Sequence, residues 1–132
     1  MSADAKGLGI RRLGQVAVPV HDVERATAFY RDVLGLPFLF AAGQLAFFDC
    51  GGVRLMLDRP GNKEFDHPSS ILYFSVPDIQ AAHQRLVDAG VTIVDKPHIV
   101  APMPDHDLWM SFFRDTENNV MALMSEVPRT SS

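Results

Sequence analysis

The segment Pro104-Asp-His-Asp107 combines residue types that serve in acid–base chemistry. His106 lies between two carboxylates, and negative neighbours stabilise the protonated form of an imidazole. Trp109 follows shortly afterwards. A loop that carries His106 and Trp109 and closes over a pocket would supply a general base or a hydrogen bond there. The same side chains also suit a purely structural role, in which local hydrogen bonds hold the loop.

A metal site is a second chemistry that this region allows. His98 and His106 offer nitrogen donors of the kind that hold zinc. Asp105 or Asp107 would add an oxygen donor, although the spacing matches no recognised ligand signature. Cys50 is the only cysteine, which excludes an intramolecular disulfide and a cysteine-based zinc site. Its position beside two glycines indicates a small, partly buried residue rather than a nucleophile.

The chain also repeats one strand-plus-helix pattern, which would position these side chains. Residues 15–22 form the first copy, and residues 71–78 form the second. Residue 71 corresponds to residue 15 and residue 78 to residue 22, a constant offset of 56 residues. We predict a strand in each copy, followed by a helix that begins at an N-capping Asp22 or Asp78. Duplicated modules commonly face each other, and their shared face is a natural place for a ligand.

Further strand-like runs complete each unit. They are residues 38–41, 44–49 and 53–58 after the first helix, and 91–94, 108–113 and 119–124 after the second. Residues 97–108 contain three prolines and are predicted to form a long loop. The predicted organisation is an N-terminal tail (1–10), a first module (11–58), a linker (59–70), a second module (71–127) and a C-terminal tail (128–132).

Composition limits the classes of function. The 132 residues are 47% hydrophobic and 21% charged, which is ordinary for a folded globular protein. The net charge of −4, without a basic run, disfavours nucleic acid or an anionic membrane as a partner. No apolar stretch is long enough to span a bilayer, and residues 1–12 lack a hydrophobic signal core. We therefore expect a cytoplasmic protein.

Three separated motifs in this order resemble the vicinal oxygen chelate superfamily, which includes glyoxalase I, bleomycin resistance proteins and extradiol dioxygenases. The motifs are Val20-His-Asp22 with Ala28-Phe-Tyr-Arg-Asp-Val-Leu-Gly-Leu36, Val76-Pro-Asp-Ile79 with Leu86-Val-Asp-Ala-Gly-Val91, and Phe112-Phe-Arg-Asp-Thr-Glu-Asn-Asn119. The resemblance implies an α+β fold. Its two βαβββ modules would form a curved, barrel-like mixed sheet around a shared cleft. It also implies a homodimer.

Many members of that superfamily hold a divalent metal through four inward positions of the cleft. By resemblance, these positions fall on Gln15, Met56, Ile71 and Ala122. Metal-binding members have Glu, His and Glu at the last three. Only Gln15 offers an oxygen donor here, and hard cations need several oxygen ligands, usually with carboxylate charge. The sequence therefore predicts that the usual metal site is degenerate and that no cofactor is bound.

Strand alternation predicts which other side chains face the cleft. With Trp109 from the loop, the predicted ligand pocket comprises Gln15, Arg54, Met56, Ile71, Tyr73, Ser75, Trp109 and Ala122. Such a mostly apolar lining is typical of a site for a small molecule, although the same side chains would also fill a closed core. Arg54 is either an anchor for a ligand carboxylate or phosphate, or a solvated residue at the rim.

Three functions follow from this pattern. The first is a protein that binds a small apolar or aromatic molecule and needs no metal, as bleomycin resistance proteins do. The second is an enzyme, either a glyoxalase-like lyase or isomerase or a dioxygenase, that uses a displaced metal or His106 as a base. The third is a scaffold whose cleft is filled by its own side chains.

Overall fold

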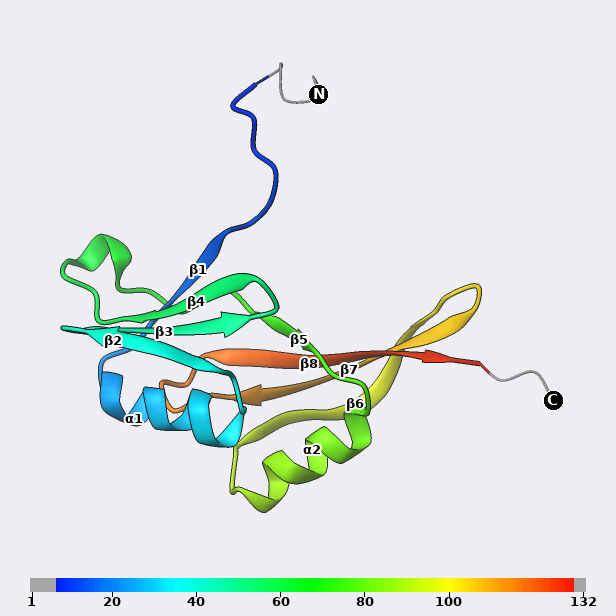
Figure 1. Cartoon of the computed structure of the whole chain (residues 1–132). Coiled ribbons are helices and arrows are strands. Elements are labelled where there is room, and N and C mark those ends of the chain that lie inside the picture. The colour runs from blue at the N-terminus through cyan, green and yellow to red at the C-terminus, as the bar shows by residue number, and fades with distance from the viewer. Residues whose placement is uncertain (1–6, 130–132) are drawn as a thin grey trace.

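Two four-stranded sheets, each with its own helix, make up the computed structural model, which describes residues 7–129 (Figure 1). The first module contains β1 (Gln15–Pro19), α1 (Val23–Ala28), a π-helical turn η2 (Phe29–Val33), β2 (Phe38–Ala42), β3 (Leu45–Cys50) and β4 (Val53–Asp58). A short 3-10 helix, η3 (Lys63–Phe65), lies in the connection. The second module contains β5 (Tyr73–Ser75), α2 (Ile79–Asp88), β6 (Ile93–Pro102), β7 (His106–Arg114) and β8 (Val120–Pro128).

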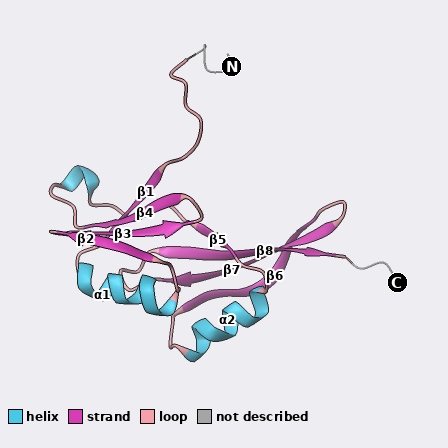
Figure 2. Ribbon diagram, in the orientation of Figure 1, coloured by secondary structure: helices cyan, strands magenta, loops and turns pink. Residues whose placement is uncertain are grey.

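The strand order is the same in both sheets. It is β1-β4-β3-β2 in the first and β5-β8-β7-β6 in the second, and in each the first strand runs parallel to the last (Figure 2). The other neighbours are antiparallel. This confirms the predicted α+β class with two βαβββ modules. Within residues 7–129, no strand of one sheet pairs with a strand of the other, so the sheets are not closed into a barrel.

Both helices begin at the predicted N-caps. The Asp22 carboxylate accepts a hydrogen bond from the Arg25 backbone N–H, and Asp78 does the same for Ala81, each at 3.1 Å. Gly90 ends the second helix at a φ of 79°, a conformation that favours glycine. The helices are short, and none in the described part of the chain is long and apolar enough to cross a membrane.

One hydrophobic core joins the two modules. Phe48, Leu55 and Leu57 line the inner face of the first sheet, and Phe113 and Met121 line that of the second, all at most 1% exposed. The ring of Phe29 lies 6.5 Å from that of Phe113, so the first helix packs against the second sheet as well as its own. The opposite face of each sheet, called its open face below, carries the exposed side chains of Gln15 and Arg54 in the first sheet and of Tyr73 and Ser75 in the second.

Residues 97–108, predicted as a loop, instead form the outer part of a long β-hairpin made by β6 and β7, so this prediction is wrong. In the pairing of β6 with β7, His98 lies opposite Met110 and Ala101 opposite Leu108. The prolines that suggested a loop are compatible with a strand because β6 is an edge strand. The pairing is also irregular between Asp95 and His98, around Pro97. Ile71, predicted to begin a strand, precedes β5.

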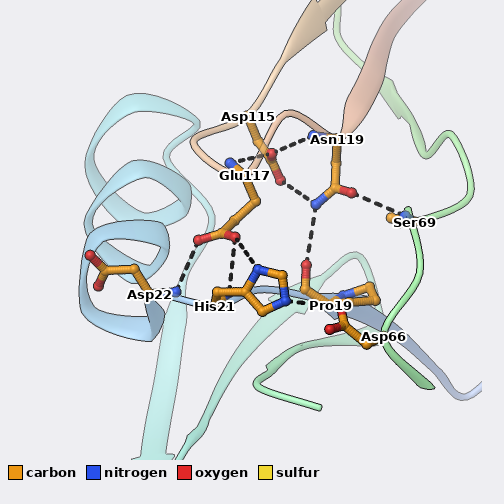
Figure 3. Close-up of polar contacts among 8 residues, drawn as sticks. All are labelled: Pro19, His21, Asp22, Asp66, Ser69, Asp115, Glu117 and Asn119. Carbon is orange, nitrogen blue, oxygen red and sulfur yellow. Dashed lines mark hydrogen bonds and ion pairs between the residues drawn. The ribbon is translucent and has the colours of Figure 1, made fainter. Parts of the chain in front are cut away.

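A buried carboxylate, Asp115, fastens the β7–β8 turn to η2, and Figure 3 shows its contacts within the turn. Asp115 is 7% exposed and accepts a hydrogen bond of 2.7 Å from the Tyr30 hydroxyl. It also accepts from the backbone N–H groups of Glu117 and Asn119 and from the Asn119 side-chain amide. Burial, and then the charge of Asp115, raise the pKa of Tyr30 well above its ordinary value, so this hydroxyl keeps its proton and remains a donor.

The same turn also holds the start of the helix and the connection between the modules (Figure 3). The Glu117 carboxylate accepts from the backbone N–H groups of His21 at 2.9 Å and Asp22 at 3.0 Å. The Asn119 side chain donates to the Pro19 carbonyl and accepts from the Ser69 N–H. These bonds join the second module to the first and to the connection between them. Each satisfies a polar group at the junction, and together they hold the two modules in one relative position.

Candidate functional site

A polar pair stands on the open face of the first sheet. Gln15 and Arg54 are register partners on the neighbouring strands β1 and β4. The Arg54 Nε donates a 2.7 Å hydrogen bond to the Gln15 side-chain oxygen. The Gln15 amide nitrogen lies 3.7 Å from the Met56 sulfur. The structure thus brings three of the predicted pocket residues together.

An aromatic wall adjoins this pair. The Arg54 guanidinium carbon lies 5.3 Å from the centroid of the Phe47 ring. Phe47 stacks on Phe40 with centroids 4.5 Å apart and an interplanar angle of 24°. Phe47 on β3 is 8% exposed, whereas Phe40 on the edge strand β2 is 46% exposed. The stack therefore runs from the interior of the sheet to its edge. A planar apolar group can lie against such a surface.

Phe40 and Phe47 are not among the pocket residues predicted from the sequence. The available signal was the pair Phe47-Phe48 within one predicted strand, because adjacent strand residues point to opposite faces. One of the two rings must then lie on the open face. Strand register decides which one, since Phe48 pairs with the core residue Leu55 and Phe47 with Met56.

The second sheet carries a smaller aromatic group on its open face. The Tyr73 and Phe112 rings meet edge to face, with centroids 5.9 Å apart. Ala122 is the register partner of both and is fully buried. Ser75 follows Tyr73 by two residues and faces the same side. Ile71 lies outside the strand and is 43% exposed.

Trp109 does not join these residues. It is the register partner of Ser125 and of Ile99, and its neighbour Met110 pairs with Met124. Its side chain packs against the hydrophobic core on the helix-covered side of the sheet. The structure therefore places Trp109 on the face opposite Tyr73, because alternate residues of β7 point to opposite faces and Trp109 shares the core side with Phe113.

The two histidines singled out from the sequence lie apart along the hairpin. His106 begins β7, with its Nδ1 2.7 Å from an Asp105 oxygen and its Nε2 3.8 Å from a Glu126 oxygen. The hydrogen bond from His106 lowers the pKa of Asp105. Along the strand, His106 is six residues from Phe112, which is roughly 20 Å. His98 pairs instead with Asp95 and the Lys96 carbonyl.

The four positions that correspond to metal ligands do not suit a divalent cation. The single oxygen donor, on Gln15, is already bound to the positive guanidinium of Arg54. Met56 supplies a thioether, and the other two side chains are hydrocarbon. In residues 7–129, no three His, Cys, Asp or Glu side chains are grouped as they would be around a metal ion.

Two cavities border these faces. One, of about 540 Å³, is lined by Arg12, Gly14, Gln15, Gly52 and Arg54. The other, of about 440 Å³, follows the edge of β5 and is lined by Tyr73, Ser75, Cys50 and apolar side chains. Burial, and then Asp49, raise the pKa of Cys50, so its thiol stays protonated and is a poor nucleophile.

The sequence matches known proteins over most of its length. Residues 12–123 match the family model of the Glyoxalase/Bleomycin resistance protein/Dioxygenase superfamily. The uncharacterized protein YraH of Bacillus subtilis (strain 168) is 26% identical over 129 residues, covering 85% of this chain and 96% of YraH. The metallothiol transferase FosB of Staphylococcus haemolyticus (strain JCSC1435) is 25% identical over 112 residues, which cover 85% of this chain but only 65% of FosB.

Solved structures share the fold. TnmS3, an antibiotic binding protein from Streptomyces sp. CB03234, superimposes with a TM-score of 0.72 at 24% identity, covering 89% of this chain and 97% of TnmS3. Lactoylglutathione lyase from Agrobacterium tumefaciens has a TM-score of 0.67 at 24% identity, with 86% and 92% covered. A binding protein and a lyase thus lie at similar structural distance, so the fold alone does not select a function.

Proposed function

The chain belongs to the glyoxalase/bleomycin resistance protein/dioxygenase superfamily, and on that premise we propose that it binds a small aromatic or apolar molecule without a metal ion. The observation that carries this proposal is the stack of Arg54, Phe47 and Phe40 on the open face of the first sheet. A mostly apolar surface with a few placed polar groups is the usual composition of a small-molecule site.

The donor set supports a site without metal. A divalent cation near Gln15 would meet the fixed positive charge of Arg54 instead of a carboxylate. Activities that require the metal site of the superfamily therefore find no suitable ligands at these positions. TnmS3, an antibiotic binding protein, has this fold, so a binding role needs no new architecture.

A homodimer would complete the site. All residues of β2 are exposed, including Phe38 at 39%, Leu39 at 48% and Phe40 at 46%. Tyr73 on the second sheet is 46% exposed. Monomeric proteins rarely expose large contiguous apolar patches. We propose that a second copy covers part of these open faces and that the two copies together enclose the ligand.

Sedimentation equilibrium tests the dimer. We expect a mass of twice 14.6 kDa for the wild type, and a shift towards 14.6 kDa for Leu39→Lys because a charge would be buried at the interface. Val87→Lys is the matched control, since Val87 on α2 is 43% exposed and should leave the mass unchanged. A wild-type protein that stays monomeric at high micromolar concentration would refute the dimer.

The binding proposal is tested by a screen of aromatic compounds against EDTA-treated protein. Compounds that bind the native state raise the melting temperature by mass action, and at 100 times Kd the stabilisation is about 2.7 kcal/mol. We expect compounds of one to three fused rings to raise the melting temperature in a concentration-dependent manner. A folded protein that no compound of the panel stabilises would contradict the proposal.

A further inference from the structure

We propose that the ligand carries an oxyanion, such as a carboxylate, and that Arg54 and Arg12 bind it beside the aromatic wall. This inference rests on the proposed function and specifies the chemical class of the ligand. The main observation is that the Arg54 guanidinium is held in place and still has free N–H donors.

Two contacts orient Arg54. Its Nε donates to the Gln15 oxygen at 2.7 Å, and its guanidinium carbon lies 5.3 Å from the Phe47 ring centroid. Across residues 7–129, no ion pair includes Arg54, and the Gln15 bond is its only side-chain hydrogen bond. The two terminal nitrogens are therefore free to donate to a carboxylate in the bidentate geometry that a guanidinium favours.

A nearby acid makes no ion pair with Arg54. Asp49 is its register partner on β3 and faces the same side of the sheet. One Asp49 carboxylate oxygen accepts a hydrogen bond of 3.2 Å from the Gly52 backbone N–H and so holds the β3–β4 turn. Although the whole chain has a net charge of −4, the Arg54 guanidinium on this face has no ion-pair partner among the described residues. Such an arrangement attracts a negative group.

A second guanidinium lies at the same place. Arg12 donates from Nη1 to the Gly52 carbonyl at 2.9 Å, which holds its side chain over the β3–β4 turn. Arg12 and Arg54 line one cavity of about 540 Å³, together with Gln15 and the two glycines Gly14 and Gly52. The glycines add no side chains, so this cavity, which both cations line, has room for an oxyanion.

The charge and the aromatic wall select one kind of molecule. Arg54 lies against Phe47, which in turn stacks on Phe40, so the cation and the apolar surface are continuous. The carboxylate of a planar aromatic acid binds the Arg54 nitrogens, and its ring extends along the open face towards Phe47 and, beyond it, Phe40. An apolar ligand without charge would leave these donors without a partner inside the site, which costs affinity.

Matched pairs of acids and amides test the inference. We would titrate benzoate, 2-naphthoate and 9-anthroate, and the amide of each, into the full chain by calorimetry. Because an ionised acceptor strengthens a hydrogen bond, we expect each acid that binds to do so about 10-fold more tightly than its amide. Raising the salt concentration should weaken the acids more than the amides.

Variants identify the residues responsible. Arg54→Gln should remove the preference for acids, and Arg54→Lys should restore only part of it because an ammonium cannot bind in the bidentate manner. Arg12→Gln should reduce the preference by a smaller factor. Arg85→Gln, the same change at an exposed site on α2, should leave it intact.

Each outcome bears on a different claim. Equal affinity for acids and amides, or an acid preference that survives in Arg54→Gln, would overturn the anion site while leaving the proposed function intact. Failure of all six compounds to bind the folded wild type would count against both.

Discussion

Replacing Asp115 by alanine is expected to lower the free energy of unfolding by about 3 kcal/mol or more, because several buried donors lose their acceptor at once. The Tyr30 hydroxyl, two backbone N–H groups and the Asn119 amide all donate to this carboxylate. The site is 7% exposed, so water cannot easily replace the lost oxygen atoms. Urea denaturation followed by circular dichroism measures the change.

Two milder variants control this prediction. Tyr30→Phe removes one of the four donors and should cost about 1 kcal/mol. Asp115→Asn keeps the size and one acceptor oxygen of the side chain and should fall between the other two variants. If Asp115→Ala unfolds within 0.5 M urea of the wild type, roughly 1 kcal/mol at typical urea slopes, the junction is not a major source of stability.

Exchanging either of two neighbouring phenylalanines for leucine should separate ligand binding from folding. Phe47 lies on the open face against Phe40 and Arg54, whereas Phe48 lies in the core and its ring contacts those of Tyr30 and Phe38. We expect Phe47→Leu to weaken the binding of aromatic acids by about 10-fold or more, since the ring stack and the cation–π contact are both lost.

The neighbouring variant should show the reverse. Phe48→Leu should lower the free energy of unfolding by about 1 to 2 kcal/mol, because the core loses two aromatic contacts. Its affinity for aromatic acids should match that of the wild type. Calorimetry and urea denaturation on both variants give the comparison. If both lose affinity equally, the open face of β3 does not bind the ligand.

Much of the fold could be predicted from the sequence because the signals are local. Asp22 and Asp78 cap helices through hydrogen bonds to backbone groups three residues away. The two copies of the pattern place these caps 56 residues apart, and this repeat was sufficient to predict two modules with the same order of strands and helix. Asn118 adopts a φ of 66° in the last turn, a left-handed conformation that asparagine tolerates.

The remaining features depend on pairing between distant strands. The prolines of β6 indicated a loop, but an edge strand with an irregular register accepts them. Trp109 lies just beyond that region, in the predicted strand 108–113, and the register of β7 turns its side chain towards the core instead of the cleft. The contacts of Arg54 with Gln15 and Phe47 join three strands, so they emerge only when the register is known.

The central claim is that this chain binds its ligand without a metal ion, and calorimetry in parallel samples tests it most directly. One sample is treated with EDTA and dialysed, and others are then incubated with zinc, nickel, manganese or ferrous iron and desalted. We predict that the aromatic acid with the highest affinity binds all of them with the same Kd and stoichiometry. Binding that requires one of these metals, together with stoichiometric metal that is lost in Gln15→Ala, would contradict the account.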